Sequence, residues 1–436
     1  MKRTPHRLLI LLLCAALLTG CATSANSGDG FLLREATIPE YPQYPEFENG
    51  WPVSEAAYEA WRSYGQDLPA VDTDAMKPFL TRSTEMLLGG ANGQNRVYSP
   101  INVYLALGML AEVTGGDSRQ QVVELLGSTP DALRQNSEAL WQKIYRMDGV
   151  VSRELAASLW LNEGIRYKQD ALDRLCRHYF AAVYQGKMGD PAYNAALQAW
   201  LDKHTGNLLT EQTHQIIMPP ETLLSLATTV YYKARWDKPF SADNTSKQVF
   251  HAPGGDVERE FMHARFTNHP YYWADRFSAV HLTMNGGTMW ILLPDEGVTV
   301  DDLLADGSAM TFLLDADSRQ CEYLNIDLAL PKFDVSSQLQ LAGALQQLGV
   351  TDVFRMDQAD FTPLTDSPAV LSSVQHGARV RIDEEGCEGA AYTVMMLAGM
   401  ARPPEKNVTF TVDRPFLFCI TVGEGLPLFA GVVNNP

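Results

Sequence analysis

Hydrophobic positions in the first half of the chain recur every three or four residues, which is the spacing of amphipathic helices. The clearest segment runs from Ile101 to Val113 and is followed by two glycines. Ser99 and Pro100 precede it as an N-cap and a first-turn proline. The same spacing predicts further helices over residues 118–126, 131–147, 169–180 and 191–204.

The second half of the chain consists mainly of short segments typical of β-strands. One such segment comes early, at 157–161, and the others lie at 224–232, 258–265, 278–284, 289–293, 322–330, 369–382, 408–412, 416–422 and 428–433. Helices that come early and strands that come late disfavour an alternating βαβ winding. We therefore predict an α+β fold in which helices cluster around large, mostly antiparallel β-sheets.

A long segment without helix or strand signals separates the strand that ends near Ile382 from the one that starts near Val408. Loops of this length inside compact domains are usually functional or disordered. The segment contains a hydrophobic run, from Val394 to Met400, which is not a disordered composition. A hydrophobic run in an exposed loop requires a functional explanation.

The start of this segment alternates between small and larger side chains. One set of alternate positions consists of Cys387, Gly389, Ala391, Thr393 and Met395, and all but the last are small. The other set includes Glu388 and Tyr392, so the charge and the ring share a face. One interpretation is a conditional strand, since Gly386 and Gly389 weaken a permanent one. The other is a long surface loop in which the alternation arose by chance.

The N-terminus has the features of a secretion signal. Lys2, Arg3 and Arg7 precede an apolar run over residues 8–18, which is too short to span a bilayer as a helix. The run leads into Leu-Thr-Gly-Cys at 18–21, which resembles the bacterial lipobox, where the signal is cleaved before an acylated cysteine. An ordinary cleaved signal with an incidental Cys21 is the alternative.

We expect three regions along the chain. Residues 1–20 are a signal peptide, and residues 21–71 are a lipidated N-terminus and proline-rich tether that contains a short helix near 55–64. Residues 72–436 form one folded domain without a second linker. This arrangement predicts a location on the extracellular face of a bacterial cell envelope, with the membrane contacted through the lipid alone.

Composition and charge exclude several classes of function. The chain has 34 Lys and Arg against 52 Asp and Glu, a net charge of −18, so we expect no nucleic-acid partner. Beyond the signal and Cys21, the cysteines are Cys176, Cys321, Cys387 and Cys419, and their wide spacing fits neither a zinc site nor a disulfide framework. Motifs for a nucleophile elbow, a zinc pair, a phosphate loop and a dinucleotide site are missing. We therefore expect no enzyme activity, cofactor or metal, and a monomeric chain.

Residues 383–391, Asp-Glu-Glu-Gly-Cys-Glu-Gly-Ala-Ala, resemble the hinge of the serpins, a family of serine protease inhibitors. Further segments that resemble this family follow one another in the family's order over roughly residues 72–436, at 95–100, 106–110, 230–236, 293–297, 330–333, 348–354, 359–361, 413–416 and 428–433. Each motif is short, but their ordered occurrence is specific.

The resemblance implies roles for particular residues. The hinge comprises Glu384, Glu385, Gly386, Cys387, Glu388, Gly389, Ala390 and Ala391. Trp236 matches the tryptophan of the region called the breach. Ser99 and His376 match polar residues of the shutter, where Asn102 and Thr228 replace the serine and asparagine that are common in the family. Cys387 stands where threonine or serine is usual and Gly389 where alanine is. Cys387 is similar in volume to the usual residue and is expected to insert, and redox sensitivity of its thiol is a hypothesis that the sequence leaves open.

Serpins present an exposed reactive-centre loop as a protease substrate, and after cleavage this loop inserts into the central sheet as a new strand. In inhibitory members the scissile bond usually begins sixteen positions after the residue matched by Glu384, which gives Met400-Ala401. An unbranched apolar residue at that position predicts elastase-, chymotrypsin- or subtilisin-like serine proteases as partners. A register shifted by two would make Arg402 the bait, although Pro403 would hinder cleavage there. The alternatives are a non-inhibitory serpin-fold surface binding module and a plain protease substrate.

Overall fold

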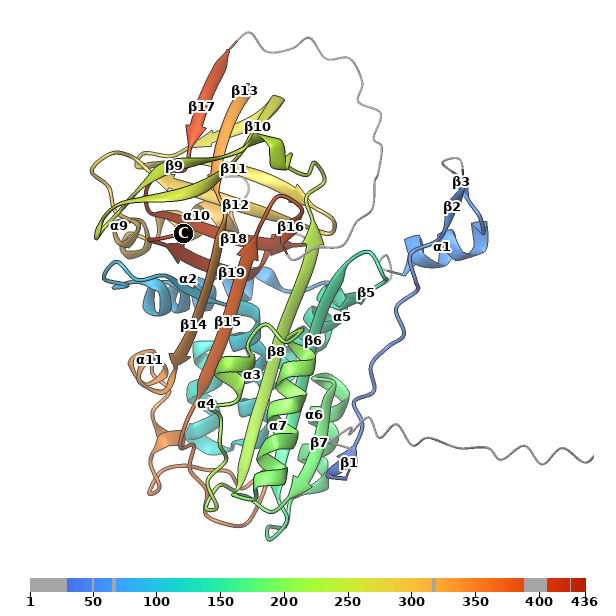
Figure 1. Cartoon of the computed structure of the whole chain (residues 1–436). Coiled ribbons are helices and arrows are strands. Elements are labelled where there is room, and N and C mark those ends of the chain that lie inside the picture. The colour runs from blue at the N-terminus through green and yellow to red at the C-terminus, as the bar shows by residue number, and fades with distance from the viewer. Residues whose placement is uncertain (1–29, 49–50, 65–67, 316–318, 388–405, 424) are drawn as a thin grey trace, which may run out of the picture.

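The computed structural model describes residues 30–48, 51–64, 68–315, 319–387, 406–423 and 425–436 (Figure 1). Two large sheets dominate the fold. The first has eight strands, in the order β1 (Leu32–Arg34), β7 (Ala181–Gly186), β6 (Ser152–Asn162), β8 (Leu224–Arg235), β16 (Gly386–Cys387), β15 (Gln375–Ile382) and β14 (Phe333–Gln340), with β5 (Arg146–Met147) paired to β6.

The second sheet has nine strands. Their order is β17 (Asn407–Thr411), β13 (Gln320–Pro331), β10 (Gly255–Trp273), β11 (Phe277–Met284), β12 (Gly287–Pro294), β18 (Phe416–Val422), β19 (Leu426–Val433) and β4 (Arg96–Tyr98), with β9 (Thr245–Ala252) paired to β10. Every residue of β18 and β19 is buried, which indicates that both faces of this part of the sheet are covered. Only the pairs β6·β7 and β13·β17 are parallel among the long pairings described.

The helices gather mostly in the half of the molecule next to the eight-stranded sheet (Figure 1). They are α1 (Glu55–Ser63), α2 (Thr73–Leu88), α3 (Pro100–Val113), α4 (Gly116–Leu125), α5 (Pro130–Ile144), α6 (Gln169–His178), α7 (Pro191–His204), α8 (Thr210–Thr213), α9 (Val300–Ala305), α10 (Ser308–Leu314) and α11 (Ala342–Gln347), with 3₁₀ turns η1 (Ala242–Asn244) and η3 (Asp352–Phe354). The α+β prediction is confirmed, with helices packed around mostly antiparallel sheets.

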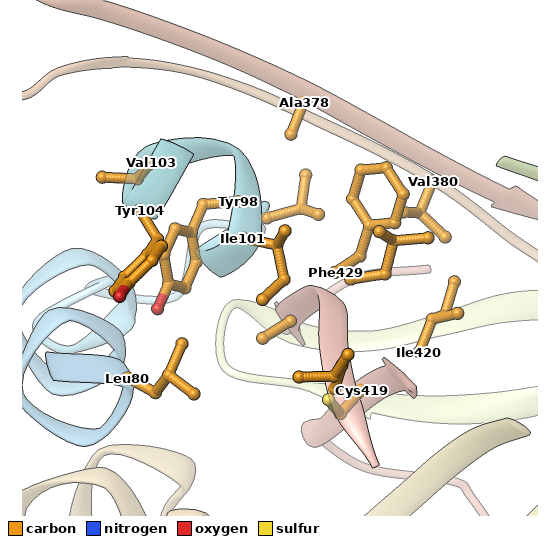
Figure 2. Packing of buried hydrophobic residues seen from close by; sticks show 14 of the residues in the cluster. Leu80, Tyr98, Ile101, Val103, Tyr104, Ala378, Val380, Cys419, Ile420 and Phe429 are labelled. Atoms are coloured by element: carbon orange, nitrogen blue, oxygen red, sulfur yellow. The ribbon is translucent and has the colours of Figure 1, made fainter. Parts of the chain in front are cut away.

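Helix α3 links the two sheets at the centre of the core. Ser99 caps it by accepting a hydrogen bond from the Asn102 backbone, as the sequence predicts. The helix contacts both β8 and β19, and nearly all of its residues are buried, so it is hydrophobic on every side. Figure 2 shows Ile101 of this helix packed near Phe429 of β19, in the nine-stranded sheet. Ala378 and Val380 of β15, in the eight-stranded sheet, belong to the same cluster.

The described part of the region predicted as a tether lies against the domain. β1 pairs with β7, and α1 forms where the sequence places a short helix. The Trp61 indole donates a hydrogen bond to Asp148 (Nε1 to Oδ2, 3.0 Å), and the Arg146 guanidinium lies 5.3 Å from the centre of the same ring system. Aromatic side chains drive this docking, since apolar rings in a linker gain from burial. The tether description therefore does not apply to these docked residues.

Asp148 anchors the docked segment and should be important for stability. Burial opposes its ionisation, but hydrogen bonds from the Val151 backbone, Trp61 and Arg146 outweigh this effect and hold its pKa below the usual range. We expect Asp148→Ala to lower the free energy of unfolding by about 2–4 kcal/mol, because it leaves buried donors without their acceptor. Urea denaturation monitored by fluorescence measures the loss.

The matched control is Asp131→Ala, which removes an exposed carboxylate that also pairs with an arginine, Arg134. Surface pairs of this kind contribute about 0–1 kcal/mol. Equal losses for the two variants would contradict the anchoring role of Asp148.

Candidate functional site

A groove lies between β8 and β15 of the eight-stranded sheet. These strands are joined at one end through the two residues of β16, where Gly386 pairs with Arg235 and Cys387 with both Ala234 and Ile382. Over the rest of their length they line a cavity of about 520 Å³. Within the described residues, β15 pairs along its other edge with β14, and β8 pairs with β6.

The groove has the geometry of a site for one additional strand. Within the described residues, β16 is the only strand between β8 and β15, and it pairs with them only through Gly386 and Cys387. Backbone polar groups in the interior of a protein require hydrogen-bond partners. A strand that extends β16 along the groove would pair with β8 on one edge and with β15 on the other.

Trp236 closes the end of the groove at which β16 lies. Its side chain is buried, and its indole Nε1 donates a hydrogen bond to the Asp383 carbonyl at 2.8 Å. The backbone N–H of Trp236 donates to the Glu385 carbonyl, and that of Phe240 donates to the Glu384 carbonyl. Residues 383–385 are therefore fixed to the turn that follows β8.

The two hinge carboxylates among the described residues have separate cationic partners. Glu384 accepts hydrogen bonds from the Thr245 hydroxyl (2.8 Å) and lies 3.3 Å from the Lys332 ammonium, whereas Glu385 pairs with Arg235 at 2.9 Å. Burial disfavours the charged form of Glu384, but the bonds from Thr245 and Lys332 outweigh it and hold its pKa below the usual range. Glu384 is therefore ionised at neutral pH and ties the hinge to the nine-stranded sheet.

Gly386 is required by the close approach of β16 to β8. A Cβ atom at this position would lie 2.4 Å from the Ala234 carbonyl oxygen and 2.7 Å from the Arg235 Cα. Both are backbone atoms, which cannot move aside without breaking the pairing of β8. Cys387, the next residue, is buried between β8 and β15, so its thiol is shielded from solvent in this state.

A polar cluster lies deeper in the groove, at the N-terminus of α3. The Ser99 backbone N–H donates to His376 Nε2 (3.0 Å), and the Asn102 side-chain amide donates to the Thr228 carbonyl (3.3 Å). His376 belongs to β15 and Thr228 to β8, so α3 is hydrogen-bonded to both strands that border the groove. Any change in the separation of the two strands must strain or exchange these bonds.

His376 should make the protein less stable in acid. Burial lowers its pKa to about 4, whereas an unperturbed histidine titrates near about 6.5. Below pH ~6.5 the unfolded chain binds a proton that the folded chain does not, so stability falls as the pH decreases through this window. The difference corresponds to about 3 kcal/mol at most. The Nε2 atom accepts from Ser99, so protonation would set two donors against each other.

The test compares the wild-type chain with His376→Gln, which offers an amide oxygen to the Ser99 N–H but does not titrate. Urea midpoints at pH 7 and at pH 4.5 should differ less for this variant. His281, whose pKa burial also lowers to about 4, is present in both proteins and cancels. An unchanged pH dependence would contradict the role assigned to His376.

Comparison with known proteins identifies the family to which the chain belongs. Residues 75–436 match the family model described as Serpin (serine protease inhibitor). The chain belongs to the serpin family. It is 27% identical over 363 residues to alpha-1-antiproteinase from Rattus norvegicus, with 80% of this chain and 85% of that protein covered. A serpin-like protein of Methanosarcina mazei is 23% identical over 382 residues, with 85% and 88% covered.

Solved serpin structures share the fold. The native state of the thermophilic serpin tengpin superposes with a TM-score of 0.72 at 21% identity, and covers 85% of this chain and 96% of its own. Thyroxine-binding globulin in complex with thyroxine gives a TM-score of 0.69 at 21% identity, with 84% and 98% covered. Serpins are mostly inhibitors of proteases rather than enzymes, which agrees with the lack of a catalytic motif in the sequence.

The structure brings the described residues of the predicted site to one end of the groove and to its interior. Trp236 lies with Glu384, Glu385, Gly386 and Cys387 at the end closed by β16, and the remaining cluster consists of Ser99, Asn102, Thr228 and His376. The other predicted residues lie outside the described residues: Cys21, Glu388, Gly389, Ala390, Ala391, Met400 and Ala401.

The sequence did not reveal the two cationic side chains that pair with the described carboxylates of the hinge. Lys332 bridges Glu384 and Glu260, and Arg235 pairs with Glu385. Both belong to segments that carry the family resemblance, but nothing in their spacing along the chain predicts these contacts. Among the described residues, no group of three or more His, Cys, Asp or Glu side chains is placed to hold a metal ion. No helix in the same residues is long and apolar enough to cross a membrane.

Proposed function

We propose that this serpin is a suicide-substrate inhibitor of serine proteases. The observation that supports this most directly is the groove between β8 and β15, which β16 enters with only two residues, and residues 388–405 follow β16 in the sequence. The protease serine attacks the Met400 carbonyl, the Ala401 amine leaves, and an ester joins Met400 to the protease. The cleaved chain then extends β16 along the groove and draws the attached protease with it.

The free energy released by insertion is sufficient to distort a protease. Each new backbone hydrogen bond contributes about 0.5–1.5 kcal/mol, so a strand of about a dozen residues gains on the order of 10 kcal/mol. A serine protease needs its triad and oxyanion hole aligned within a fraction of an ångström, so distortion stops hydrolysis of the ester. Inhibition therefore depends on insertion being faster than deacylation.

The proposed target class follows from Met400. Its unbranched apolar side chain fits the specificity pockets of elastase-, chymotrypsin- or subtilisin-like enzymes, whereas a trypsin-like pocket selects Arg or Lys. The chain without its signal peptide is incubated with one protease of each class, and the products are separated in SDS. We expect a covalent complex that survives denaturation, together with a fragment that begins at Ala401.

The rival functions give different products. Clean cleavage without a complex would identify a plain substrate, and resistance to every protease class would favour a binding module. A protease whose active-site serine is chemically blocked serves as the control, because it cannot form the ester. A complex with the blocked enzyme would contradict the covalent mechanism.

We propose that the chain is anchored at the outer face of a bacterial envelope through an acylated Cys21. Docking of β1 limits the distance between anchor and domain, since only about ten residues separate Cys21 from Leu32 and about 35 Å is their greatest span. The inhibitor would therefore lie close to the membrane surface. Protease treatment of intact cells should release the domain, and its retention would contradict an exposed anchor.

A further inference from the structure

Helix α7 and residues 205–218 that follow it form a cover over the groove. Three α7 side chains spaced four residues apart, Asn194, Gln198 and Asp202, hold this following segment. Asn194 Oδ1 accepts from the Met218 N–H (2.8 Å), Gln198 Nε2 donates to the Ile216 carbonyl (2.9 Å), and Asp202 accepts from Thr213 (2.5 Å) and pairs with His214 (3.0 Å). The helix and the segment therefore behave as one unit.

The cover is attached to the sheet on the far side of β8. His204 of α7 pairs with Glu154 of β6 (2.5 Å), and apolar side chains of α7 pack on Trp160 of the same strand. From there the segment after α7 extends across the groove, since Leu208 and Leu209 line the cavity together with residues of both β8 and β15. Leu209 comes within 3.5 Å of the Cβ position of Gly377 on β15.

Arg379 joins the cover to the other side of the groove. It lies on β15, and its guanidinium donates to the Leu208 carbonyl through Nη1 at 3.0 Å. Nε and Nη2 donate to the two carboxylate oxygens of Asp334 on β14, at 2.7 and 2.6 Å. Asp334 thus orients the guanidinium by a two-point contact, which leaves the third nitrogen directed at the cover.

We propose that Arg379 is a clasp that sets the rate at which a strand enters the groove; this inference rests on the proposed inhibitory function. Alternate residues of β15 point to opposite faces of the sheet, and Ala378 and Val380 point into the core (Figure 2), so Arg379 lies on the face under the cover. A strand paired with β15 places its own outward side chains between that face and Leu208. The bond from Arg379 to Leu208 must break before the strand passes.

The clasp is a positioning element and makes no contact with a protease. Charge-assisted hydrogen bonds are stronger than neutral ones, but this guanidinium is partly exposed and its bond is correspondingly weakened. We expect Arg379→Ala to accelerate strand entry about 3- to 10-fold, the range for a single hydrogen bond. Asp334→Ala frees the guanidinium without changing the groove and should give a smaller acceleration in the same direction.

The probe is a synthetic peptide of residues 388–399, incubated with the intact chain at a fixed temperature below its melting point. The rate of formation of the one-to-one complex is measured by native mass spectrometry for wild type, Arg379→Ala, Arg379→Lys and Asp334→Ala. Lysine keeps the charge but not the three-point geometry, so its rate should fall between those of wild type and Arg379→Ala. Hydrogen exchange in residues 205–218 should rise in the same order.

The matched control is Arg276→Ala, which removes an arginine of similar exposure from the Arg276–Asp306 pair, away from the groove. It should lower the melting temperature as much as Arg379→Ala does and leave the rate of peptide entry unchanged. Equal entry rates for wild type and Arg379→Ala would overturn the clasp alone, as would acceleration by Arg276→Ala. Failure of the wild-type chain to take up the peptide would overturn both the clasp and the proposed insertion.

Loss of the clasp should affect inhibition differently from a change in protease binding. Faster insertion competes better with deacylation, so Arg379→Ala should form more complex per molecule cleaved, with the initial rate of cleavage unchanged. A changed rate of cleavage, with the same amount of complex formed per molecule cleaved, would assign Arg379 to protease recognition instead.

Discussion

A single cut within residues 388–405 is expected to raise the melting temperature of this serpin by about 10–20 °C. The cut frees the chain that follows β16 to fill the 520 Å³ groove, where, among the described residues, only the two residues of β16 lie between β8 and β15. Insertion of about a dozen residues contributes on the order of 10 kcal/mol. For a domain of this size each kcal/mol shifts the melting temperature by roughly 1–2 °C. Circular dichroism before and after limited proteolysis measures the shift.

The control is a cut at the exposed turn between β9 and β10. A protease site placed at Gly254, where a side chain would meet nothing within 4 Å, breaks the chain without supplying a strand to the groove. This cut should leave the melting temperature unchanged or lower it. If the chain cleaved within 388–405 melts no higher than the intact chain, the uncut fold is not a trapped state and the insertion mechanism fails.

The sequence predicts those elements of the fold whose signals are local. Ser99 and Pro100 mark the start of α3, and α7 has the predicted bounds, because cap and proline preferences act within a turn. Strand β10 is longer than predicted, since its 19 residues include a bulge and exposed polar stretches whose alternation is weak. The existence of elements follows from short-range pattern, but their length depends on the partner strands.

Residues 369–374 show that a buried hydrophobic segment is not always a strand. Their apolar side chains predicted a strand that begins at 369, but β15 begins at Gln375. Ala369, Leu371 and Val374 instead pack against the core from an irregular segment, and the Leu371 N–H bonds to the Val353 carbonyl. A hydrophobic run indicates that a segment is buried. It does not indicate which backbone groups form hydrogen bonds with the segment, so it does not distinguish a strand from an irregular segment.

The candidate site also has one part that the sequence predicts and one part that it does not. The small residues and glycines from Gly386 onward are visible in the sequence because they follow one another in a single segment. The bonds that hold the groove closed at one end and covered in the middle join residues far apart, such as Trp236 with Asp383 and Arg379 with Leu208. An arginine on an exposed strand face looks like ordinary surface charge until the segment after α7 is placed beside it.

Replacement of Met400 by arginine should redirect the inhibitor to trypsin-like proteases. A pocket with an acid at its base binds a guanidinium and rejects an apolar side chain that leaves the acid unpaired. We expect Met400→Arg to raise the rate constant for inhibition of trypsin by about 10³-fold or more, and to lower that for chymotrypsin by a similar factor. Second-order inhibition rates measured with excess inhibitor give both values.

Arg402 offers the matched control, because it is the bait if the cut lies two residues further along. Arg402→Ala should leave trypsin and chymotrypsin inhibition unchanged, and the double variant Met400→Arg with Arg402→Ala should behave as Met400→Arg. Loss of inhibition in Arg402→Ala, with no response to Met400→Arg, would move the scissile bond to Arg402. The length of chain between β16 and the cut would then grow by two residues, and the strand that enters the groove would carry the protease correspondingly further along the sheet.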